Sequence, residues 1–167
     1  MQLRPLLLIP LILILLLLQG TFFAYVPIGG AYLQAVVALT LAWGLWAEPV
    51  ESLTVAFFAG LAIDLLSTAP LGSSSVALML ALTIIQPFRV LLTNSRIVVP
   101  VVLGLGGMLT FRLTSLLLQR IAGYPIGSEA WQSLPATVIL HALVALPIYW
   151  ILRAISASTR RTRSFDF

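Results

Sequence analysis

AFFAGLAIDLLSTAPLGSSSVALML, residues 56–80, contains two apolar segments that meet at a short turn. Asp64 carries the only charge in this stretch, and the sequence Pro70-Leu71-Gly72 follows it six residues later. Proline cannot continue a helix interior, and glycine gives the backbone the freedom that a tight turn needs. The stretch therefore predicts two successive apolar helices joined by a short turn.

The composition of the whole chain extends this prediction to a membrane protein. Of 167 residues, 60% are hydrophobic and 8% are charged, whereas soluble domains contain about 25% charged residues. In hydrocarbon every backbone N–H and C=O group needs an internal partner, and the alternating pattern of a barrel strand is found nowhere in the sequence. We therefore expect an all-α integral membrane protein.

Six hydrophobic segments follow one another, separated by proline, glycine or charged residues. They cover residues 6–23, 31–46, 50–66, 75–92, 97–121 and 131–152. A spanning helix needs about 20 apolar residues, so the second and third segments are at the short limit. We expect a compact bundle of six, alternatively five, transmembrane helices. It would form a single domain over residues 1–153, followed by a short basic tail over residues 154–167.

The arginines predict the orientation, because short cytoplasmic loops retain positive charge. All nine basic residues are arginine. With six spans and the N-terminus inside, both termini are cytoplasmic and only Arg120 lies near an outer loop. The arginines placed on the cytoplasmic side are Arg4, Arg89, Arg96, Arg153, Arg160, Arg161 and Arg163. The basic tail is too short for a nucleic-acid-binding domain and is interpreted as a tether to anionic membrane lipid.

Asp64 and Arg112 are charges inside apolar segments, and such charges usually have a function or a specific partner. At ~1.5 Å per helical residue, they lie ~20 Å and ~22 Å from the cytoplasmic ends of their helices. This matched depth predicts an ion pair that joins the third and fifth helices. The alternatives are a pair that faces a partner subunit, or no direct contact, in which case the carboxyl group of Asp64 could be protonated.

Small and polar residues predict the remaining helix contacts. The serines at 73–75 follow the turn and are expected to cap the fourth helix. Gly60 and the GLGG run at 104–107 are expected to let neighbouring helices approach closely. Gly72 is expected to supply the backbone freedom of the turn.

A catalytic role is not expected for this chain. The best candidate is a dyad of one of the serines 73–75 with His141, but the serines lie at the outer boundary and His141 lies ~15 Å deeper. His141 is instead expected to hydrogen-bond a neighbouring helix. The sequence shows no metal-ligand cluster and no phosphate-binding glycine loop, so we expect a non-enzyme without a cofactor or metal.

The stretch at 56–80 resembles the signature of the MreD family, in which Gly-x-x-x-Asp ends the third hydrophobic segment and a Leu-(Leu/Ile)-Ser turn and Leu-Gly follow. The matching residues are Gly60, Asp64, Leu65, Leu66, Ser67, Leu71 and Gly72. The resemblance implies a non-catalytic scaffold in the bacterial inner membrane that supports lateral peptidoglycan synthesis and rod cell shape. It also implies direct binding to MreC, and more indirect association with MreB, RodA and the transpeptidase paired with RodA.

The residues from Asp64 to Ser73, with Ser67 and Pro70 between them, are then the candidate partner-sensitive region. The alternative is that this turn only starts the fourth helix. A second functional interpretation is the substrate-binding subunit of an energy-coupling-factor vitamin transporter, whose fold the MreD family is expected to share. Against it, the first segment is rich in bulky leucine, and the outer loops offer few polar groups for a vitamin pocket.

Overall fold

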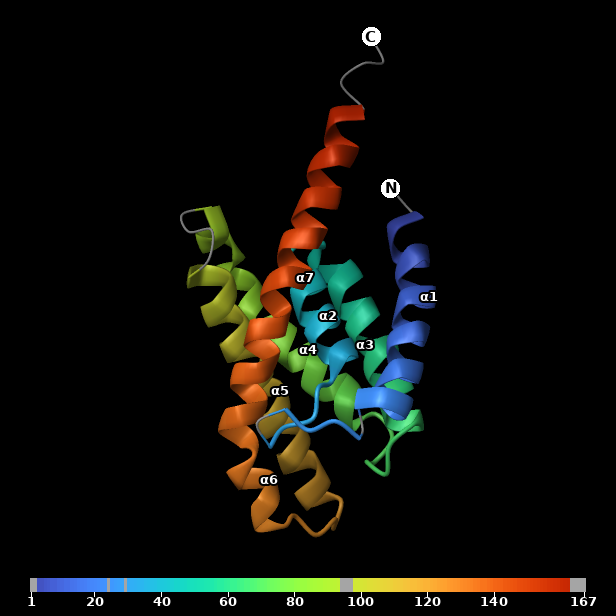
Figure 1. Cartoon of the computed structure of the whole chain (residues 1–167), viewed down its shortest axis with the longest axis vertical. Coiled ribbons are helices and arrows are strands. Elements are labelled where there is room, and N and C mark those ends of the chain that lie inside the picture. The colour runs from blue at the N-terminus through green and yellow to red at the C-terminus, as the bar shows by residue number, and fades with distance from the viewer. Residues whose placement is uncertain (1–2, 24, 29, 94–97, 163–167) are drawn as a thin grey trace.

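The computed structural model describes residues 3–23, 25–28, 30–93 and 98–162, and this part of the chain is almost entirely helical (Figure 1). The α-helices are α1 (Leu3–Leu18), α2 (Ala35–Gly44), α3 (Pro49–Leu65), α4 (Ser73–Ile85), α5 (Val98–Ile121), α6 (Ser128–Gln132) and α7 (Leu134–Thr162). A π-helical turn, η1 (Gln19–Phe23), continues α1, and a 3-10 segment, η2 (Gln86–Thr93), continues α4. No strand occurs among the described residues, so the predicted all-α class is confirmed.

The long helices lie side by side in a bundle (Figure 1). Helix α1 begins and α7 ends at the upper end of Figure 1, here called the terminal end. The turn between α3 and α4 and the short helix α6 lie at the opposite end, here called the α6 end. The main packing partners are α3 with α4, α4 with α5, and α5 with α7.

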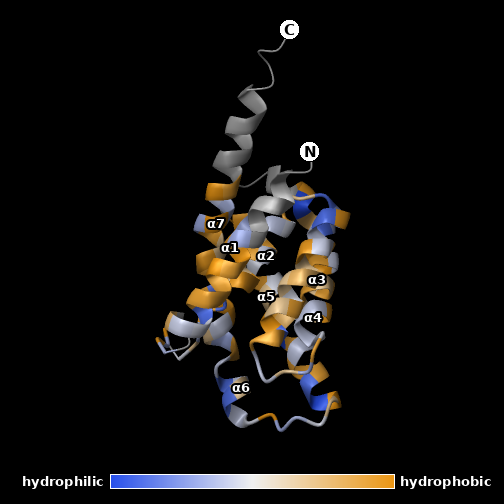
Figure 2. Cartoon of the chain, turned by 90° about the vertical axis from the view of Figure 1, so that its right-hand side faces the viewer, coloured by the Kyte–Doolittle hydropathy of each residue, from blue (hydrophilic) through white to orange (hydrophobic). Residues whose placement is uncertain are grey.

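Three of the described helices are long and apolar enough to cross a membrane: Ser73–Val90, Pro100–Ile121 and Leu134–Leu152. Two shorter apolar helices cover Pro10–Phe22 and Ala35–Gly44. Hydrophobic residues cover the middle of the bundle, and hydrophilic residues gather mainly at its ends, including α6 (Figure 2). These features indicate a membrane protein, whereas the count of six spans and the transporter-subunit fold stay predictions.

Helix α2 forms the centre of the bundle and contacts α1, α3, α4, α5 and α7. Its sequence AVVALTLAWG has no polar face, as expected for a helix surrounded by others. Nine of its ten residues are buried. At 1.5 Å per residue, α2 is about 15 Å long, roughly half the thickness of the hydrocarbon core of a bilayer.

The segment before α2 is not helical, and here the predicted boundary is wrong. A helix was expected from residue 31, but α2 begins at Ala35. Ile28 and Ala31 form an isolated antiparallel bridge, with N–H···O distances of 2.8 and 3.1 Å. Gly30 makes this reversal possible because its φ of +80° lies in the left-handed region. The backbone therefore enters the bundle through a non-helical turn before α2 starts.

Arg89 reaches the turn between α2 and α3 at the terminal end. Its Nη1 donates a hydrogen bond of 2.8 Å to the carbonyl oxygen of Ala47. The other arginines expected on the cytoplasmic side fall outside the description: Arg96 and Arg163 altogether, and Arg4, Arg153, Arg160 and Arg161 in their side chains.

Candidate functional site

The carboxylate of Asp64 caps the first turn of α4. Asp64 is 3% exposed, and its two oxygens lie 3.2 and 3.1 Å from the backbone nitrogen of Ser74, which donates to them. The hydroxyl group of Ser73 makes a longer contact of 3.5 Å to Oδ1. Negative charge is favourable at a helix N-terminus, where backbone N–H groups lack intrahelical partners.

This arrangement corrects the prediction that the serines cap α4. Gly72 is the N-cap residue, with φ of +88°, and it has no side chain with which to cap. The three serines lie inside the first turn, so their own backbone N–H groups are the ones that need an acceptor. Asp64 at the end of α3 supplies one for Ser74, and the positive φ confirms the predicted role of Gly72.

Gly60 places α3 and α4 in backbone contact. A Cβ atom built on Gly60 would lie 2.4 Å from both Cα and N of Ser75. Nearby, the Ser75 hydroxyl group donates a hydrogen bond of 2.9 Å to the carbonyl oxygen of Phe57. The predicted close helix contact at Gly60 is therefore confirmed, and it brings α4 within reach of Asp64.

Ser67 and Pro70 shape the turn itself. The hydroxyl oxygen of Ser67 accepts a hydrogen bond of 3.2 Å from the N–H of Ala69. The carbonyl oxygen of Pro70 accepts one of 3.0 Å from the N–H of Ser73. Both residues therefore act within the turn.

Three leucines contribute most of the apolar surface of this turn. Leu65, Leu66 and Leu71 are 69%, 67% and 68% exposed. We call them the turn leucines. The carboxylate of Asp64 is thus used for an internal contact, and the surface that the turn offers to lipid or to a partner combines these leucines with the exposed Ser67 and Thr68.

Arg112 does not pair with Asp64, so the predicted ion pair is wrong. Asp64 is engaged with α4, whereas Arg112 lines a cavity of about 600 Å³ at the α6 end. In the described part of the chain no ion pair joins these two residues. Equal depth along two helices does not fix the direction in which each side chain points, and here the directions differ.

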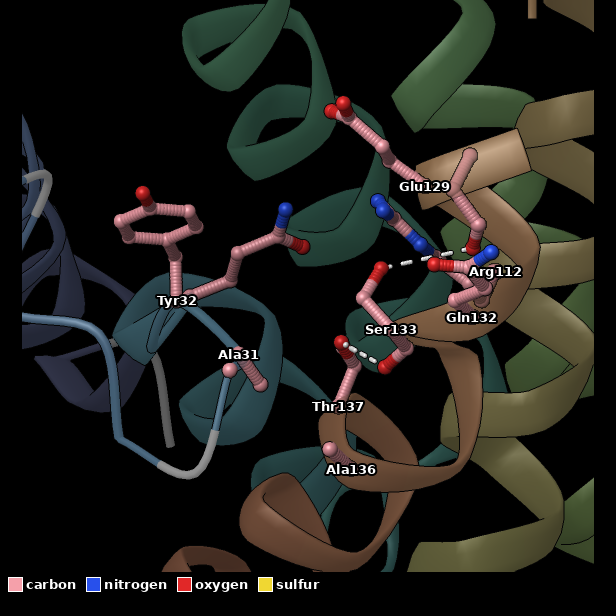
Figure 3. A pocket seen from close by; sticks show the side chains of 11 residues that line it. Ala31, Tyr32, Arg112, Glu129, Gln132, Ser133, Ala136 and Thr137 are labelled. Carbon is pink, nitrogen blue, oxygen red and sulfur yellow. Dashed lines mark hydrogen bonds between the residues drawn. The ribbon is translucent and has the colours of Figure 1, made fainter. Parts of the chain in front are cut away.

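The cavity lies between the segment preceding α2 and the helices α5, α6 and α7. Its polar lining consists of Tyr32, Gln34, Arg112, Glu129, Gln132, Ser133 and Thr137. Arg112 and Glu129 extend into it from one side and Tyr32 from the other (Figure 3). Nε of Arg112 and Oε1 of Gln34 are buried and have no hydrogen-bond partner.

Sequence reasoning missed this cavity because its walls come from distant parts of the chain. The only prediction relevant to the cavity was that the outer loops would offer few polar groups for a pocket. That prediction was wrong, because several polar side chains of these segments line the cavity. The signal was present in Gln34, a polar residue inside an apolar segment, and in the polar residues 128–133 next to a helix start.

His141 accepts a hydrogen bond at the start of the central helix α2. It is 1% exposed, and its Nε2 accepts a hydrogen bond of 2.8 Å from the N–H of Gln34. Its Nδ1 lies 2.6 Å from the carbonyl oxygen of Thr137, which assigns the hydrogen to Nδ1. Oε1 of Gln19 lies 3.4 Å from the N–H of Val36 and accepts from it. The predicted hydrogen bond from His141 to a neighbouring element is confirmed.

The serine–histidine dyad considered above is not assembled. His141 bonds Gln34 and Thr137, whereas the serines at 73–75 contact Asp64 and Phe57. Within the described ranges no group of three or more His, Cys, Asp or Glu residues is placed to hold a metal ion.

Comparisons with known proteins found no relative of this chain. No protein family, curated protein or solved structure matches this chain.

The glycine run in α5 is only partly used for packing. A Cβ on Gly107 would lie 3.1 Å from Ile85 and 3.3 Å from Leu41, so this glycine lies at a tight contact with α4 and α2. A Cβ on Gly104 would lie 3.8 Å from Ala142, an ordinary van der Waals contact, and a Cβ on Gly106 would meet nothing within 4 Å. The predicted helix contact is therefore confirmed at Gly107 and Gly104, and wrong at Gly106.

Proposed function

We propose that this chain is a non-catalytic membrane scaffold of the MreD type, which binds MreC and supports lateral peptidoglycan synthesis and rod cell shape. In this proposal the bundle has six spans in the bacterial inner membrane, and both termini are cytoplasmic. MreB, RodA and the transpeptidase paired with RodA are more distant members of the same assembly.

The observation that carries the proposal is the packed turn between α3 and α4. Gly60 permits the backbone contact, Asp64 caps α4 and Gly72 adopts the required positive φ. The residues on which the resemblance to the MreD family rests are thus residues that this fold needs together. If the match to the family motif were accidental, its residues would not be expected to act together in one helix–turn–helix contact.

The same geometry changes the expected mode of partner binding. Asp64 is buried and engaged, so its role toward a partner is indirect, through the shape of the turn. The exposed turn leucines are the contact surface that we propose for MreC. They lie at the α6 end, which in the proposed orientation faces outward, where MreC leaves its single span and continues into its extracytoplasmic domain.

Co-purification with MreC tests this proposal. The chain and MreC from the same host are co-expressed, solubilised in mild detergent and recovered through a tag on the chain. In one variant Leu66 and Leu71 are both replaced by serine. In the matched control, Leu117, which is 58% exposed on α5, is replaced by serine.

We expect MreC to be recovered with the unmodified chain and with the control, and to be lost with the Leu66→Ser, Leu71→Ser variant at unchanged membrane yield. Failure to recover MreC with the unmodified chain would overturn the scaffold proposal. Full retention by the double variant would overturn only the proposed contact surface.

The cavity beside Arg112 favours a second candidate, the substrate-binding subunit of an energy-coupling-factor transporter. Its volume of about 600 Å³ is within the usual range for small-molecule sites, and polar side chains converge on it. The same co-purification distinguishes the two functions. Recovery of an energy-coupling transmembrane subunit with its ATPases, and no MreC, would favour the transporter.

A further inference from the structure

The cavity beside Arg112 has a charge distribution that suggests a specific class of ligand. Arg112 and Glu129 carry opposite charges and line the same space, yet no ion pair joins them in the described part of the chain. A charged group in a largely apolar surrounding is stabilised only by a partner of opposite charge or by hydrogen bonds. Arg112 is half-buried with its Nε enclosed and needs such a partner, whereas Glu129 is exposed, and neither charge is paired with the other, so both are available to a ligand.

The donor side of the cavity comes from Arg112. Its Nε is buried and has no hydrogen-bond partner, and its guanidinium group has no acceptor capacity. A guanidinium group presents N–H donors in a planar arrangement that matches the oxygens of phosphate or carboxylate. This wall of the cavity is suited to an anion.

Four of the other polar side chains of the lining, Gln34, Glu129, Ser133 and Thr137, offer acceptor oxygens. The hydroxyl group of Thr137 donates to the carbonyl oxygen of Ser133 at 2.8 Å, and that of Ser133 makes a longer contact of 3.4 Å to Ala130 (Figure 3). Because those hydrogens are directed to the backbone, the hydroxyl oxygens offer only lone pairs to the cavity. Oε1 of Gln34 is a buried acceptor without a donor, and Glu129 adds a carboxylate. This set is suited to an ammonium group.

We propose that the cavity binds a zwitterionic aminophosphate group, with its phosphate at Arg112 and its ammonium group at the acceptors around Glu129. The cavity lies at the end of the bundle, where phospholipid head groups are found beside a membrane protein. The ligand is then the head group of phosphatidylethanolamine, or a soluble aminophosphate with the same chemistry. The inference does not depend on the scaffold function.

Binding by the purified full chain in detergent, measured by native mass spectrometry, tests the proposal. The probes are phosphatidylethanolamine, phosphatidylglycerol and free phosphoethanolamine, each titrated separately. Arg112→Gln removes the charge of the donor, and Glu129→Gln removes that of the main acceptor. Arg120→Gln is the matched control, because Arg120 is an exposed arginine in the last turn of the same helix.

We expect the unmodified chain and Arg120→Gln to bind phosphatidylethanolamine more tightly than phosphatidylglycerol. Arg112→Gln should weaken the binding by about tenfold or more, the usual effect of removing a charged hydrogen-bond partner. Glu129→Gln should remove the preference over phosphatidylglycerol. Binding of free phosphoethanolamine at comparable affinity would identify a soluble ligand as the source, and binding of the lipid alone would identify the head group.

Equal affinity for phosphatidylethanolamine and phosphatidylglycerol in the unmodified chain would overturn the proposal. So would equal losses in Arg112→Gln and Arg120→Gln, because these would reflect general surface charge. If Arg112→Gln does not fold, Glu129→Gln decides the matter at an exposed position, since the proposal requires this variant to lose the lipid preference.

Discussion

Replacing Gly60 by alanine tests the central contact of the α3–α4 unit with the smallest possible change. The new methyl carbon would lie 2.4 Å from Cα and N of Ser75, whereas ordinary van der Waals contacts begin near 3.4 Å. Because both opposing atoms belong to the backbone, no side-chain rotation relieves the clash. Helix α4 must therefore retreat from α3 by about 1 Å.

That displacement also affects the cap. The nitrogen of Ser74 lies 3.1 and 3.2 Å from the Asp64 oxygens, and a further 1 Å would remove the hydrogen bond. Forcing an extra carbon into a packed site costs about 1–3 kcal/mol. Losing a hydrogen bond to a charged group costs about 1.5–3 kcal/mol. Alanine is more favourable than glycine inside a helix by about 1 kcal/mol, which offsets part of this loss. We expect a net loss of roughly 1.5–5 kcal/mol in the free energy of unfolding.

The free energy of unfolding is measured by titration with sodium dodecyl sulfate in mixed micelles, followed by tryptophan fluorescence. Gly106→Ala is the matched control, since it makes the same substitution inside a helix where a Cβ would meet no atom within 4 Å. The control should be unchanged or more stable by up to about 1 kcal/mol.

A double-mutant cycle with Asp64→Ala separates the two contributions. Once Gly60→Ala has moved α4 away, removing the carboxylate should cost much less than it does in the unmodified chain. If Gly60→Ala were as stable as Gly106→Ala, the backbone contact would be refuted. If the two substitutions were additive, the contact would stand but its link to the cap would be refuted.

Three further predictions concern other parts of the bundle. Gly72→Ala should lower the free energy of unfolding by about 1–2 kcal/mol in the same titration, because φ at this residue is +88°; an unchanged value would contradict the left-handed turn. His141→Leu should cost about 1–3 kcal/mol by leaving the N–H of Gln34 without an acceptor, and His141→Gln should recover part of this loss. The sequence contains no cysteine, so single-cysteine variants report topology directly. An impermeant maleimide on intact cells should label Ser128→Cys, and should label Ser164→Cys only after the membrane is permeabilised; the reverse pattern would invert the proposed orientation.

The helix boundaries that the sequence predicted best are those marked by strong local signals. The third segment was expected over 50–66 and is found as Pro49–Leu65, where a proline starts the helix and a polar turn follows it. The fifth was expected to end at residue 121 and ends at Ile121, and the described part of this helix begins at Val98. The start of α2 was misplaced because no proline or charge separates residues 31–34 from the helix, and their non-helical form depends on tertiary contacts such as the hydrogen bond from Gln34 to His141.

The site shows the same division between local and tertiary information. The apolar residues around Asp64 and Arg112 in the sequence correctly identified them as charges that need partners, because that identification uses only the neighbouring residues along the chain. Their actual surroundings depend on the rotation of each helix about its axis and on a loop more than 70 residues away from Arg112 in the sequence. No spacing rule contains that information, so the cavity and the cap became visible only in three dimensions.

The short central helix α2 has a consequence for the biogenesis of this protein. A helix of ten residues, about 15 Å long, is too short to cross the bilayer when it first leaves the ribosome. The N–H of Gln34, just before α2, is bonded by His141, which is synthesised more than 100 residues later. We therefore expect α2 to reach its buried position only after α7 has been made. A chain stopped before residue 134 should leave α2 accessible to proteases or quality-control factors, and a ribosome-stalled series of increasing length would reveal the point at which this protection begins.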